Sequence, residues 1–371
     1  MKRIRTIALC GIAMAVLVAC GSAQEREGDP NLIMDFESYK PISTLVVPEH
    51  PLTRAKFPFI DIHAHLRNGA DEAQAASYVA DMDGLNMGLA VNLSGRSGDQ
   101  LLEGMTNLAE RHPGRIVLFA NVDFDGMDEP GWTERAVAQF EKDVRNGARG
   151  LKIFKNLGMY TEDSNGRVST NDPRIDPIWA KAGELGVPVL IHTADPEPFW
   201  SPRDSLNERW LELKQRPRRM RPAEPSFETL MGEQFDLFEK HPNTNFISAH
   251  MAWMANDLPG LSELLDRFPN MYVEMGAVVA EIGRQPVTAR QFLIDYQDRV
   301  LFGKDSWAPS EYHVYFRVLE TTDEYFDYYR ARHAHWKLYG VGLPDDVLKK
   351  IYYGNALDLV PGLDRSRFPA L

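Results

Sequence analysis

The sequence predicts an α/β protein of the (β/α)8-barrel class, because short β-rich runs alternate with helical stretches along most of its 371 residues. The eight β-rich runs span residues 57–65, 88–93, 116–122, 150–154, 187–192, 245–250, 271–274 and 300–305. The helical patterns between them span residues 72–85, 101–112, 132–146, 177–185, 227–241 and 261–268. Their spacing of about 32 residues a unit between the first and fifth runs fits βαβ units, which need roughly 30.

Two stretches exceed this regular spacing. The interval between the fifth and sixth runs is too long for one unit, and the excess falls in residues 195–226. This insertion follows the fifth strand, so it lies at the carboxyl-terminal face of the barrel, where barrel enzymes place their active sites. After the eighth run, an aromatic-rich segment over residues 312–339 and a closing helix over residues 345–353 predict a C-terminal helical extension, which ends at Gly354 and Asn355.

The first residues have the composition of an export signal. A basic start is followed by an apolar core over residues 7–19, which at about 13 residues is short for a membrane span of roughly 20. The Leu-Val-Ala-Cys sequence that ends at Cys20 resembles a bacterial lipobox. The resemblance implies a signal peptide over residues 1–19 and a lipid anchor on Cys20, with Gly21 directing the protein to the outer membrane, facing the periplasm. A plain signal peptide cut nearby is the alternative.

Composition excludes several classes of partner and site. The formal net charge is −12, and removal of residues 1–19 makes it about −15, which argues against nucleic-acid binding and against a broad basic membrane-binding face. Cys10 leaves with the signal and Cys20 carries the lipid, so no cysteine remains for a disulfide or a thiolate ligand. We expect residues 20–52 to form a tether with an N-terminal arm, and residues 53–371 to form the functional domain.

Residue types suited to metal binding end four of the predicted strands. His63 and His65 end the first run, and residues two apart on a strand face the same side. His192 ends the fifth run, His250 the sixth and Asp305 the eighth. A histidine that hydrogen-bonds within the core explains any one of these positions, but burying all of them unpaired costs several kcal/mol. A shared cation offsets this cost, so we expect the Asp305 carboxylate within about 6 Å of the His63 and His65 nitrogens.

From about Phe57 to Pro361, including the closing stretch KKIYYGNALDL, the chain resembles the amidohydrolase superfamily. Within it, the chain is similar to the amidohydrolase-related branch, which includes the aminocarboxymuconate-semialdehyde decarboxylase-like enzymes. By this resemblance, the metal ligands are His63, His65, His192 and Asp305. His250 is then either a ligand of a second metal or the acid or base that contacts the substrate, and Asp305 also takes and returns a proton. The implied cofactor is one or two divalent ions, zinc first, with manganese or iron as alternatives.

Two buried-strand residues have more than one interpretation. Lys152 lies in a Gly-Leu-Lys-Ile-Phe run that resembles the hydantoinase and dihydroorotase branch, where such a lysine is carboxylated and bridges two metals. The alternatives are that Lys152 holds a substrate carboxylate or that its amine reaches out to solvent. Asp61 faces the barrel interior one layer below His63, either supporting the metal ligands or adding polarity to the core.

The chain departs from the pattern of the branch at two places. The usual glycine two residues after the histidine of the sixth strand is Ala252, followed by Trp253, and Lys304 precedes Asp305 where threonine or serine is usual. Both changes alter the wall of the pocket more than its metal ligands. Trp253 is therefore a candidate substrate contact.

Weaker signals come from loops. Arg96 follows the second strand and either presents its charge to an anionic substrate or sits in an ordinary turn. Trp200 and Arg209, in the insertion, either line the pocket or form part of the insertion's own core. His333 and His335 form a second His-x-His, but in a helical or loop stretch such residues diverge, so we expect surface or hydrogen-bonding roles.

These observations predict a metal-dependent hydrolase that acts on a small ester, lactone or amide through metal-activated water. The alternative is a metal-dependent non-oxidative decarboxylase, a carbon–carbon lyase, of an aromatic or dienoic carboxylic acid. A third hypothesis is a lipoprotein that uses the barrel only to bind a ligand. The expected partners are a small-molecule substrate and, through the anchor at Cys20, a membrane, while the oligomeric state stays open.

Overall fold

The computed structural model describes residues 34–371. The predicted signal peptide and the lipidation site at Cys20 lie outside these residues. Contacts divide the chain into two units, Met1–Val46 and Val47–Leu371. In the described part of the first unit, residues 36–38 form the short 3-10 helix η1 (Phe36–Ser38). Among residues 34–371, no helix combines the length and the apolar character needed to cross a membrane.

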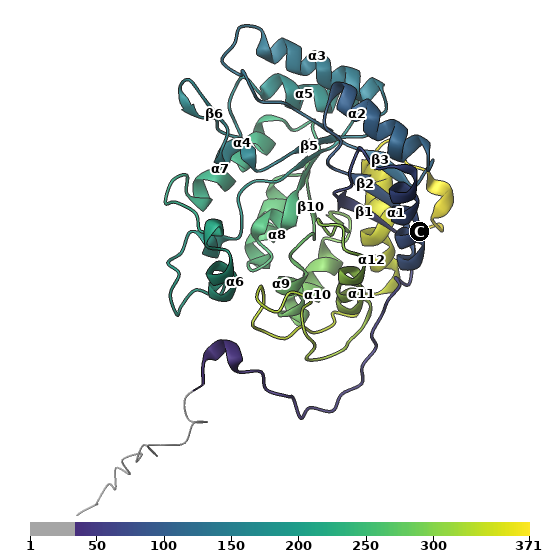
Figure 1. Ribbon diagram of the computed structural model, residues 1–371, viewed down its shortest axis with the longest axis vertical. Helices are drawn as coiled ribbons and strands as arrows, with labels where there is room; N and C mark the ends of the chain where they lie inside the picture. Colours follow the sequence, from purple (N-terminus) through teal and green to yellow (C-terminus); the bar gives the residue numbers. More distant parts are fainter. Residues whose placement is uncertain (1–33) are drawn as a thin grey trace, which may run out of the picture. The chain divides into compact units, whose positions relative to one another are not determined.

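Short parallel strands build a barrel in the second unit (Figure 1). They are β1 (Phe59–Ala64), β2 (Met87–Asn92), β3 (Ile116–Leu118), β4 (Ala120–Asn121), β5 (Leu151–Ile153), β8 (Val189–Ile191), β9 (Phe246–Ser248), β10 (Met271–Glu274) and β11 (Val300–Leu301). β3 and β4 flank Phe119 and share the third position of the barrel. Each of the eight predicted β-rich runs therefore contains a strand, in the predicted order, and the predicted barrel class is confirmed.

The barrel closes between its first and last strands. The Ile62 amide donates to the carbonyl of Phe302 at 3.1 Å, and the Asp305 amide donates to the carbonyl of His63 at 2.7 Å. A parallel bridge also pairs Ala64 with Asp305. The two ends of the sequence of strands are thus neighbours, which brings the end of β1 beside the end of β11.

Helices follow most strands and surround them (Figure 1). They are α1 (Glu72–Leu85), α2 (Gly98–Gly104), α3 (Trp132–Arg145), α4 (Asn156–Met159), α5 (Asp176–Leu185), α6 (Trp210–Gln215), α7 (Phe227–Lys240), α8 (Leu258–Arg267), α9 (Val279–Gly283), α10 (Pro286–Asp295), α11 (Tyr312–Glu320), α12 (Asp345–Lys349) and α13 (Asn355–Leu359). The π-helical turns η2 (Met105–Glu110) and η7 (Lys350–Gly354) extend α2 and α12. A small antiparallel hairpin, β6 (Glu162–Asp163) with β7 (Gly166–Arg167), lies between β5 and α5 and was not predicted.

Local sequence signals explain where several helices begin and end. Asp71 accepts a hydrogen bond from the Gln74 amide at the start of α1, and Ser226 accepts one from the Thr229 amide at the start of α7. Such side-chain caps satisfy amides that have no partner within the helix. The helix α5 ends at Gly186, whose φ of 64° is in the left-handed region that glycine tolerates.

The insertion between β8 and α7 is irregular and carries its own small core. Its short helical segments are η3 (Glu197–Phe199), α6 and η4 (Pro217–Arg219). Phe199 and Leu213 are buried within it. The predicted insertion therefore exists, and it connects the carboxyl-terminal end of β8 with the start of α7.

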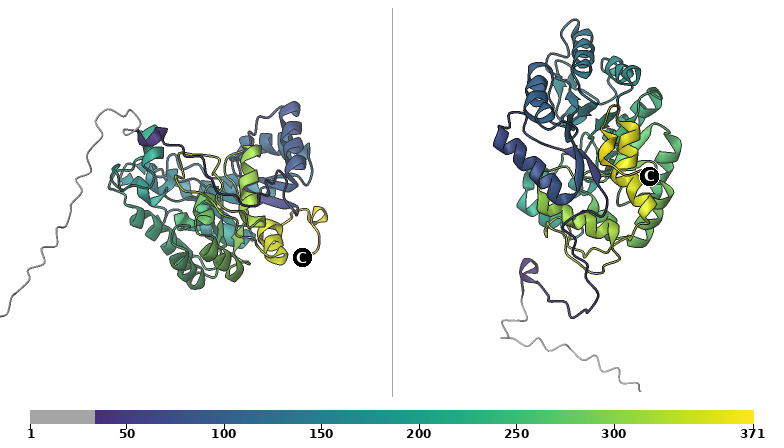
Figure 2. Two further views of the ribbon diagram at one scale, coloured as in Figure 1. Left: turned by 90° about the horizontal axis from the view of Figure 1, so that it is seen from below. Right: turned by 90° about the vertical axis from the view of Figure 1, so that its right-hand side faces the viewer.

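The C-terminal extension packs beside β1 (Figure 2). Tyr352 contacts Phe59 with ring centroids 5.9 Å apart, and the Phe302 amide donates to the carbonyl of Ile351 at 2.9 Å. The predicted end of the closing helix at Gly354 and Asn355 is wrong. Gly354 has a helical φ of −57°, so the helical segment continues through α13. Three 3-10 turns complete the element list: η5 (Ala249–Trp253), η6 (Pro309–Glu311) and η8 (Arg365–Arg367).

Candidate metal centre

His63, His65 and Asp305 converge at the carboxyl-terminal end of the barrel. The Nε2 atoms of His63 and His65 lie 3.7 and 3.5 Å from Oδ1 of Asp305. These distances are well within the 6 Å expected from the sequence. Two ligand atoms about 2 Å from one ion lie roughly 3.3 Å apart in a tetrahedral site, so the three side chains need little movement to share a cation. They form one of the clusters that can hold a metal.

The backbone of the segment after β11 aims Asp305 at the histidines. The Asp305 amide is anchored to the carbonyl of His63, and the φ of 84° at Asp305 is unusual for a residue with a side chain. Such conformations cluster at functional sites. Burial opposes ionisation of Asp305, but the charges of His63 and His250 outweigh it and lower the pKa of the carboxyl to about 2. The group is therefore an anion, as a metal ligand must be.

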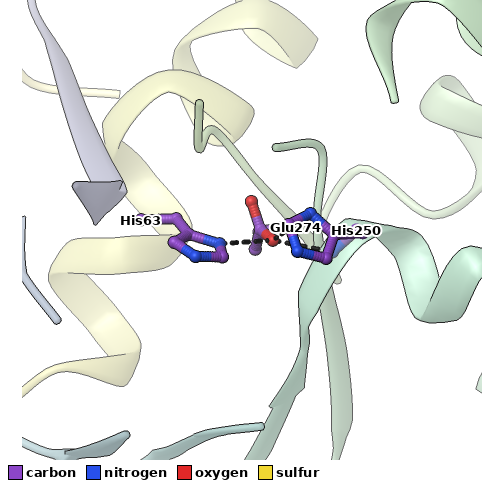
Figure 3. Close-up of side chains that lie close together, drawn as sticks. All are labelled: His63, His250 and Glu274. Atoms are coloured by element: carbon purple, nitrogen blue, oxygen red, sulfur yellow. Dashed lines mark hydrogen bonds and ion pairs between the residues drawn. The ribbon is translucent and has the colours of Figure 1, made fainter. Parts of the chain in front are cut away.

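Glu274, at the end of β10, is a site residue that the sequence interpretation missed. Its carboxylate is fully buried between His63 and His250 (Figure 3). Oε1 accepts from Nδ1 of His63 at 2.9 Å and from the His250 amide at 2.7 Å, while Oε2 accepts from the Gly276 amide at 2.6 Å. Burial opposes its ionisation, yet the charge of His63 and these hydrogen bonds lower the pKa of Glu274 to about 2.

The role of Glu274 follows from its bond to His63. A carboxylate that accepts from Nδ1–H fixes the tautomer of the ring and leaves the Nε2 lone pair for a metal. With His63 and His250, Glu274 forms a second group close enough to hold an ion, but its oxygens already have three donors. One signal for it was present in the sequence, since an acid ends the seventh predicted run.

His250 lies in a left-handed turn that follows β9. His250, Met251, Ala252 and Trp253 all have φ between 53° and 58°, and no glycine relieves the strain. Nδ1 of His250 donates to the carbonyl of Gly276 at 2.7 Å, which leaves Nε2 without a proton. Burial lowers the pKa of His250 to about 4, so the ring is neutral at neutral pH. A neutral imidazole can bind a metal or accept a proton.

His192, after β8, lies beside His250 rather than in the cluster around Asp305. Its Nδ1 is 3.4 Å from Nε2 of His250. Its Nε2 is buried and has no hydrogen-bond partner within residues 34–371. Burial also lowers the pKa of His192 well below its usual value. Because Nε2 of His250 carries no proton, Nδ1 of His192 is the donor in their contact, which leaves Nε2 of His192 as an unpaired acceptor. A buried acceptor without a partner is costly, and a cation beside it removes the cost.

Lys152 is buried in β5, and its Nζ has no hydrogen-bond partner among the described residues. Its contacts include the ring of Phe154, with Nζ 5.4 Å from the ring centroid. Burial lowers the pKa of Lys152 to about 7, against the attraction of Glu274 and Asp305. The amine does not reach solvent, which contradicts the interpretation of Lys152 as a side chain that extends to the surface.

Asp61 is anchored to three groups one layer below the site. It accepts from the amides of His63 and Lys304 at 2.9 and 3.2 Å and from the Tyr312 hydroxyl at 2.5 Å. Burial raises the pKa of Asp61 despite the bond to Tyr312. Through the amides, Asp61 holds the end of β1, which carries His63, against the segment after β11 that carries Asp305.

A cavity of about 140 Å³ opens beside His192, His250 and Asp305. Trp253 lines it and stacks on His250, with ring centroids 4.3 Å apart. His333 also lines this cavity, with Nε2 3.6 Å from Oε1 of Glu212, a closer approach to the site than the loop position of His333 indicated. His335 is exposed on the surface of the protein and does not line this cavity.

The other residues proposed to bind substrate lie elsewhere. Trp200 packs in the insertion, where its indole N–H donates to the carbonyl of Pro225 at 2.9 Å. Arg96 is exposed and borders a wider depression on the other side of His65, together with Arg67. The structure therefore brings Trp253, but neither Trp200 nor Arg96, to the cavity beside Asp305.

The residues present fit a divalent cation. Two imidazole nitrogens and an ionised carboxylate meet within bonding range of one point. The buried nitrogens of His192 and Lys152 have no hydrogen-bond partner among the described residues. Nitrogen and oxygen ligands of this kind suit zinc, manganese or iron.

Comparisons with known proteins agree with the barrel fold. A TIM-barrel protein from Bordetella bronchiseptica is 14% identical, with a TM-score of 0.50, over 81% of this chain and 98% of that one. A 4-oxalomesaconate hydratase from Rhodopseudomonas palustris is 13% identical, with a TM-score of 0.51, over 82% of this chain and 95% of the hydratase. A dihydroxybenzoic acid decarboxylase from a Polaromonas species was solved with manganese and 2-nitroresorcinol. It is 15% identical, with a TM-score of 0.51, over 82% of this chain and 96% of the decarboxylase.

At these identities, the solved structures show a shared fold. A search of curated proteins finds no significant match. The sequence itself matches the family described as amidohydrolase over residues 60–362, which include all the metal-ligand candidates. The chain therefore belongs to the amidohydrolase family.

Proposed function

We propose that the chain is a metal-dependent hydrolase of a small ester, lactone or amide. The observation that carries the proposal is the convergence of His63, His65 and Asp305 near a buried Lys152 whose amine has no hydrogen-bond partner among the described residues. The neutral form of an amine reacts with carbon dioxide to give a carbamate, and the lowered pKa of Lys152 makes this form available near neutral pH. Carboxylation of Lys152 would add a carboxylate to the ligand set and allow two ions.

The chemistry that a bound divalent cation supplies is Lewis acidity toward water and a carbonyl oxygen. Asp305 is ionised, so its free oxygen accepts the proton from the attacking water and returns it to the leaving group. His250 presents a neutral Nε2 toward the site, where it hydrogen-bonds the substrate or exchanges a proton with it. Trp253 forms the wall behind His250 and excludes water from that side.

We propose zinc as the cofactor, with manganese or iron as alternatives. The ligands are His63, His65, His192 and Asp305, which is a nitrogen-rich set that suits zinc. The manganese in the similar decarboxylase supports manganese as the first alternative. His192 needs to turn its unpaired Nε2 toward the cluster of Asp305 to complete this set.

Decarboxylation is the second candidate, and the geometry of His250 favours it. The cluster of His63, His65 and Asp305 suffices for one ion, which leaves Nε2 of His250 free to take a proton from solvent water and pass it to carbon as carbon dioxide departs. The similar structure named a dihydroxybenzoic acid decarboxylase supports this alternative. Under it, Lys152 stays an amine, and the substrate is an aromatic or dienoic carboxylic acid.

The test is the metal content and turnover of the purified mature protein and of Lys152→Ala. Hydrolysis predicts two metal equivalents a chain, a ¹³C carbamate signal after growth with labelled bicarbonate, and loss of one equivalent and of the carbamate signal in Lys152→Ala. One equivalent in both proteins, with carbon dioxide released from an aromatic acid, overturns the hydrolase and favours the decarboxylase. His335→Ala serves as a control because His335 lies on the surface.

We also propose that the protein is exported and anchored to the outer membrane through acylated Cys20. The basic start, the apolar core and the Leu-Val-Ala-Cys sequence support the proposal. In the native host, the wild-type protein is expected in the membrane fraction and Cys20→Ala in the soluble periplasmic fraction. Equal release of both proteins contradicts the lipid anchor.

A further inference from the structure

The insertion and two other segments place a group of cations around the cavity beside the metal centre. Five basic side chains line it: Lys155, Arg209, Arg219, Arg221 and Arg330. They come from the end of β5, from the insertion and from the segment after α11. The cations therefore surround the entrance to Asp305 from several directions, although the chain as a whole is acidic.

The carboxylates next to these cations are shared. Asp195 accepts from Nζ of Lys155 at 2.5 Å and from Nε of Arg221 at 2.8 Å. Glu212 likewise pairs with both Arg209 and Arg219. Each of these carboxylates therefore pairs with two basic side chains. Two of the four positive charges have no carboxylate of their own within these two groups.

Two further acids lie behind the cavity wall. Glu281 pairs with Arg209, and Glu311 pairs with Arg330 and with the buried amine of Lys304. Counting these acids with Asp195, Glu212 and the ionised Asp305, which also lines the cavity, five carboxylates face the five lining bases and Lys304, so one positive charge remains among these groups.

Exposure shows which groups face the cavity. The side chains of Lys155, Arg219 and Arg330 are 30%, 29% and 31% exposed, whereas those of Asp195 and Glu212 are 6% and 3% exposed. These two acids are therefore less exposed than Lys155 and Arg219, and the surface offered to a ligand beside the Asp305 carboxylate is mainly cationic. Guanidinium groups held in place by buried carboxylates are well suited to bind oxyanions through paired hydrogen bonds.

Arg330 is held in place together with Lys304, the residue that stands where threonine or serine is usual. Nη2 of Arg330 donates to Glu311 at 3.0 Å and to Oγ of Ser306 at 2.9 Å. Nζ of Lys304 binds the same Glu311 and the carbonyl of Ser306, at 2.6 Å from the latter. Lys304 is therefore a positioning residue. Through Glu311 it links the segment that carries Asp305 to the Arg330 guanidinium, which lines the cavity.

We propose that this cationic cavity is a subsite for a carboxylate or phosphate group of the substrate, bound by Arg219, Arg330 and Lys155. The reacting bond of the same molecule lies at Asp305. The inference deepens the proposed function, on which it rests, by assigning the substrate an anionic group separate from the bond that reacts. The specificity for this group resides in the insertion and the C-terminal segment rather than in the barrel strands.

The test measures binding of glutarate and of inorganic phosphate to metal-loaded and metal-free protein by calorimetry at low salt. The variants are Arg219→Gln and, as a matched control, Arg218→Gln, which removes the same charge from an exposed neighbour that does not line the cavity. We expect Arg219→Gln to weaken anion binding about tenfold, as for the loss of one charge-assisted hydrogen bond, and Arg218→Gln to leave it unchanged. Tighter binding of glutarate than of phosphate assigns a carboxylate group, and the reverse assigns a phosphate.

Equal binding by both variants, or no saturable binding of either anion to the wild-type protein, overturns the subsite. Lys155→Met provides a second variant with the same expected loss if Arg219→Gln does not fold. Failure of the proposed function has a different signature. A protein that takes up no metal, but whose anion binding still depends on Arg219, contradicts the metal-dependent enzyme while leaving the subsite in place.

Discussion

The Oε1 atom of Glu274 lies 2.9 Å from Nδ1 of His63, and both side chains are buried. This pair links strands that are distant in sequence and fixes the ring whose other nitrogen faces Asp305. The bond to His63 explains why Glu274 is buried at the centre of the site, although its oxygens already accept three hydrogen bonds and are not free to bind a metal. Its removal is therefore a specific test of how the site is organised.

Glu274→Gln should lower metal affinity 10- to 100-fold, the usual cost of losing a carboxylate partner of a ligating histidine. An amide has one oxygen, so it cannot accept from His63, the His250 amide and the Gly276 amide as the carboxylate does. Competition with a fluorescent zinc chelator measures the affinity. Glu233→Gln is the control, because Glu233 is also buried but pairs with Arg167. Equal metal affinity in the two variants would contradict the role of Glu274.

Tyr312→Phe should lower the free energy of unfolding by roughly 1–3 kcal/mol, because it leaves a buried oxygen of Asp61 without its donor. Tyr353→Phe is a matched control. The Tyr353 hydroxyl is buried with no hydrogen-bond partner among residues 34–371, so its removal should be neutral or stabilising. Urea unfolding followed by circular dichroism measures both. If the two substitutions change stability equally, Asp61 does not depend on Tyr312.

His333 should make stability depend on pH. Burial, together with the charges of Arg219 and Arg209, lowers its folded-state pKa from 6.5 to about 3. Between these values the unfolded chain binds the extra proton, so stability falls as the pH is lowered from 6.5 toward 3, by at most about 1.4 kcal/mol per pH unit.

The measurement for His333 is a difference between two proteins. The free energy of unfolding is compared at pH 7 and pH 5 for the wild type and for His333→Gln. We expect the wild type to lose more stability than the variant on acidification, since other titrating groups are common to both. A variant that loses as much as the wild type would show that His333 is not held neutral in the folded state.

The sequence predicted the barrel because its periodicity is local. Each β-rich run and each helical stretch carries its own signal, and the strand ends placed His63, His65 and Asp305 on one face before any contact was known. The end of the closing helix was wrong because Gly354, usually a stop signal, has helical angles there.

The rest of the site depends on features that have no local signal. The left-handed turn at residues 250–253 contains no glycine, so nothing in the sequence indicates that it aims His250 back at Gly276. Arg219 reaches the cavity through an irregular insertion whose path is set by its own packing. Glu274 is the exception, since an acid that ends an apolar strand is a local signal for a buried partner of a nearby histidine.

Metal stoichiometry of the wild-type protein and of His63→Ala, measured by mass spectrometry after dialysis, tests the metal centre most directly. The shared site of His63, His65 and Asp305 predicts at least one tightly bound equivalent in the wild type. His63→Ala should lose the metal and turnover while keeping its circular dichroism spectrum, and His335→Ala should keep all three. Full metal content and turnover in His63→Ala would contradict the metal centre proposed for this barrel.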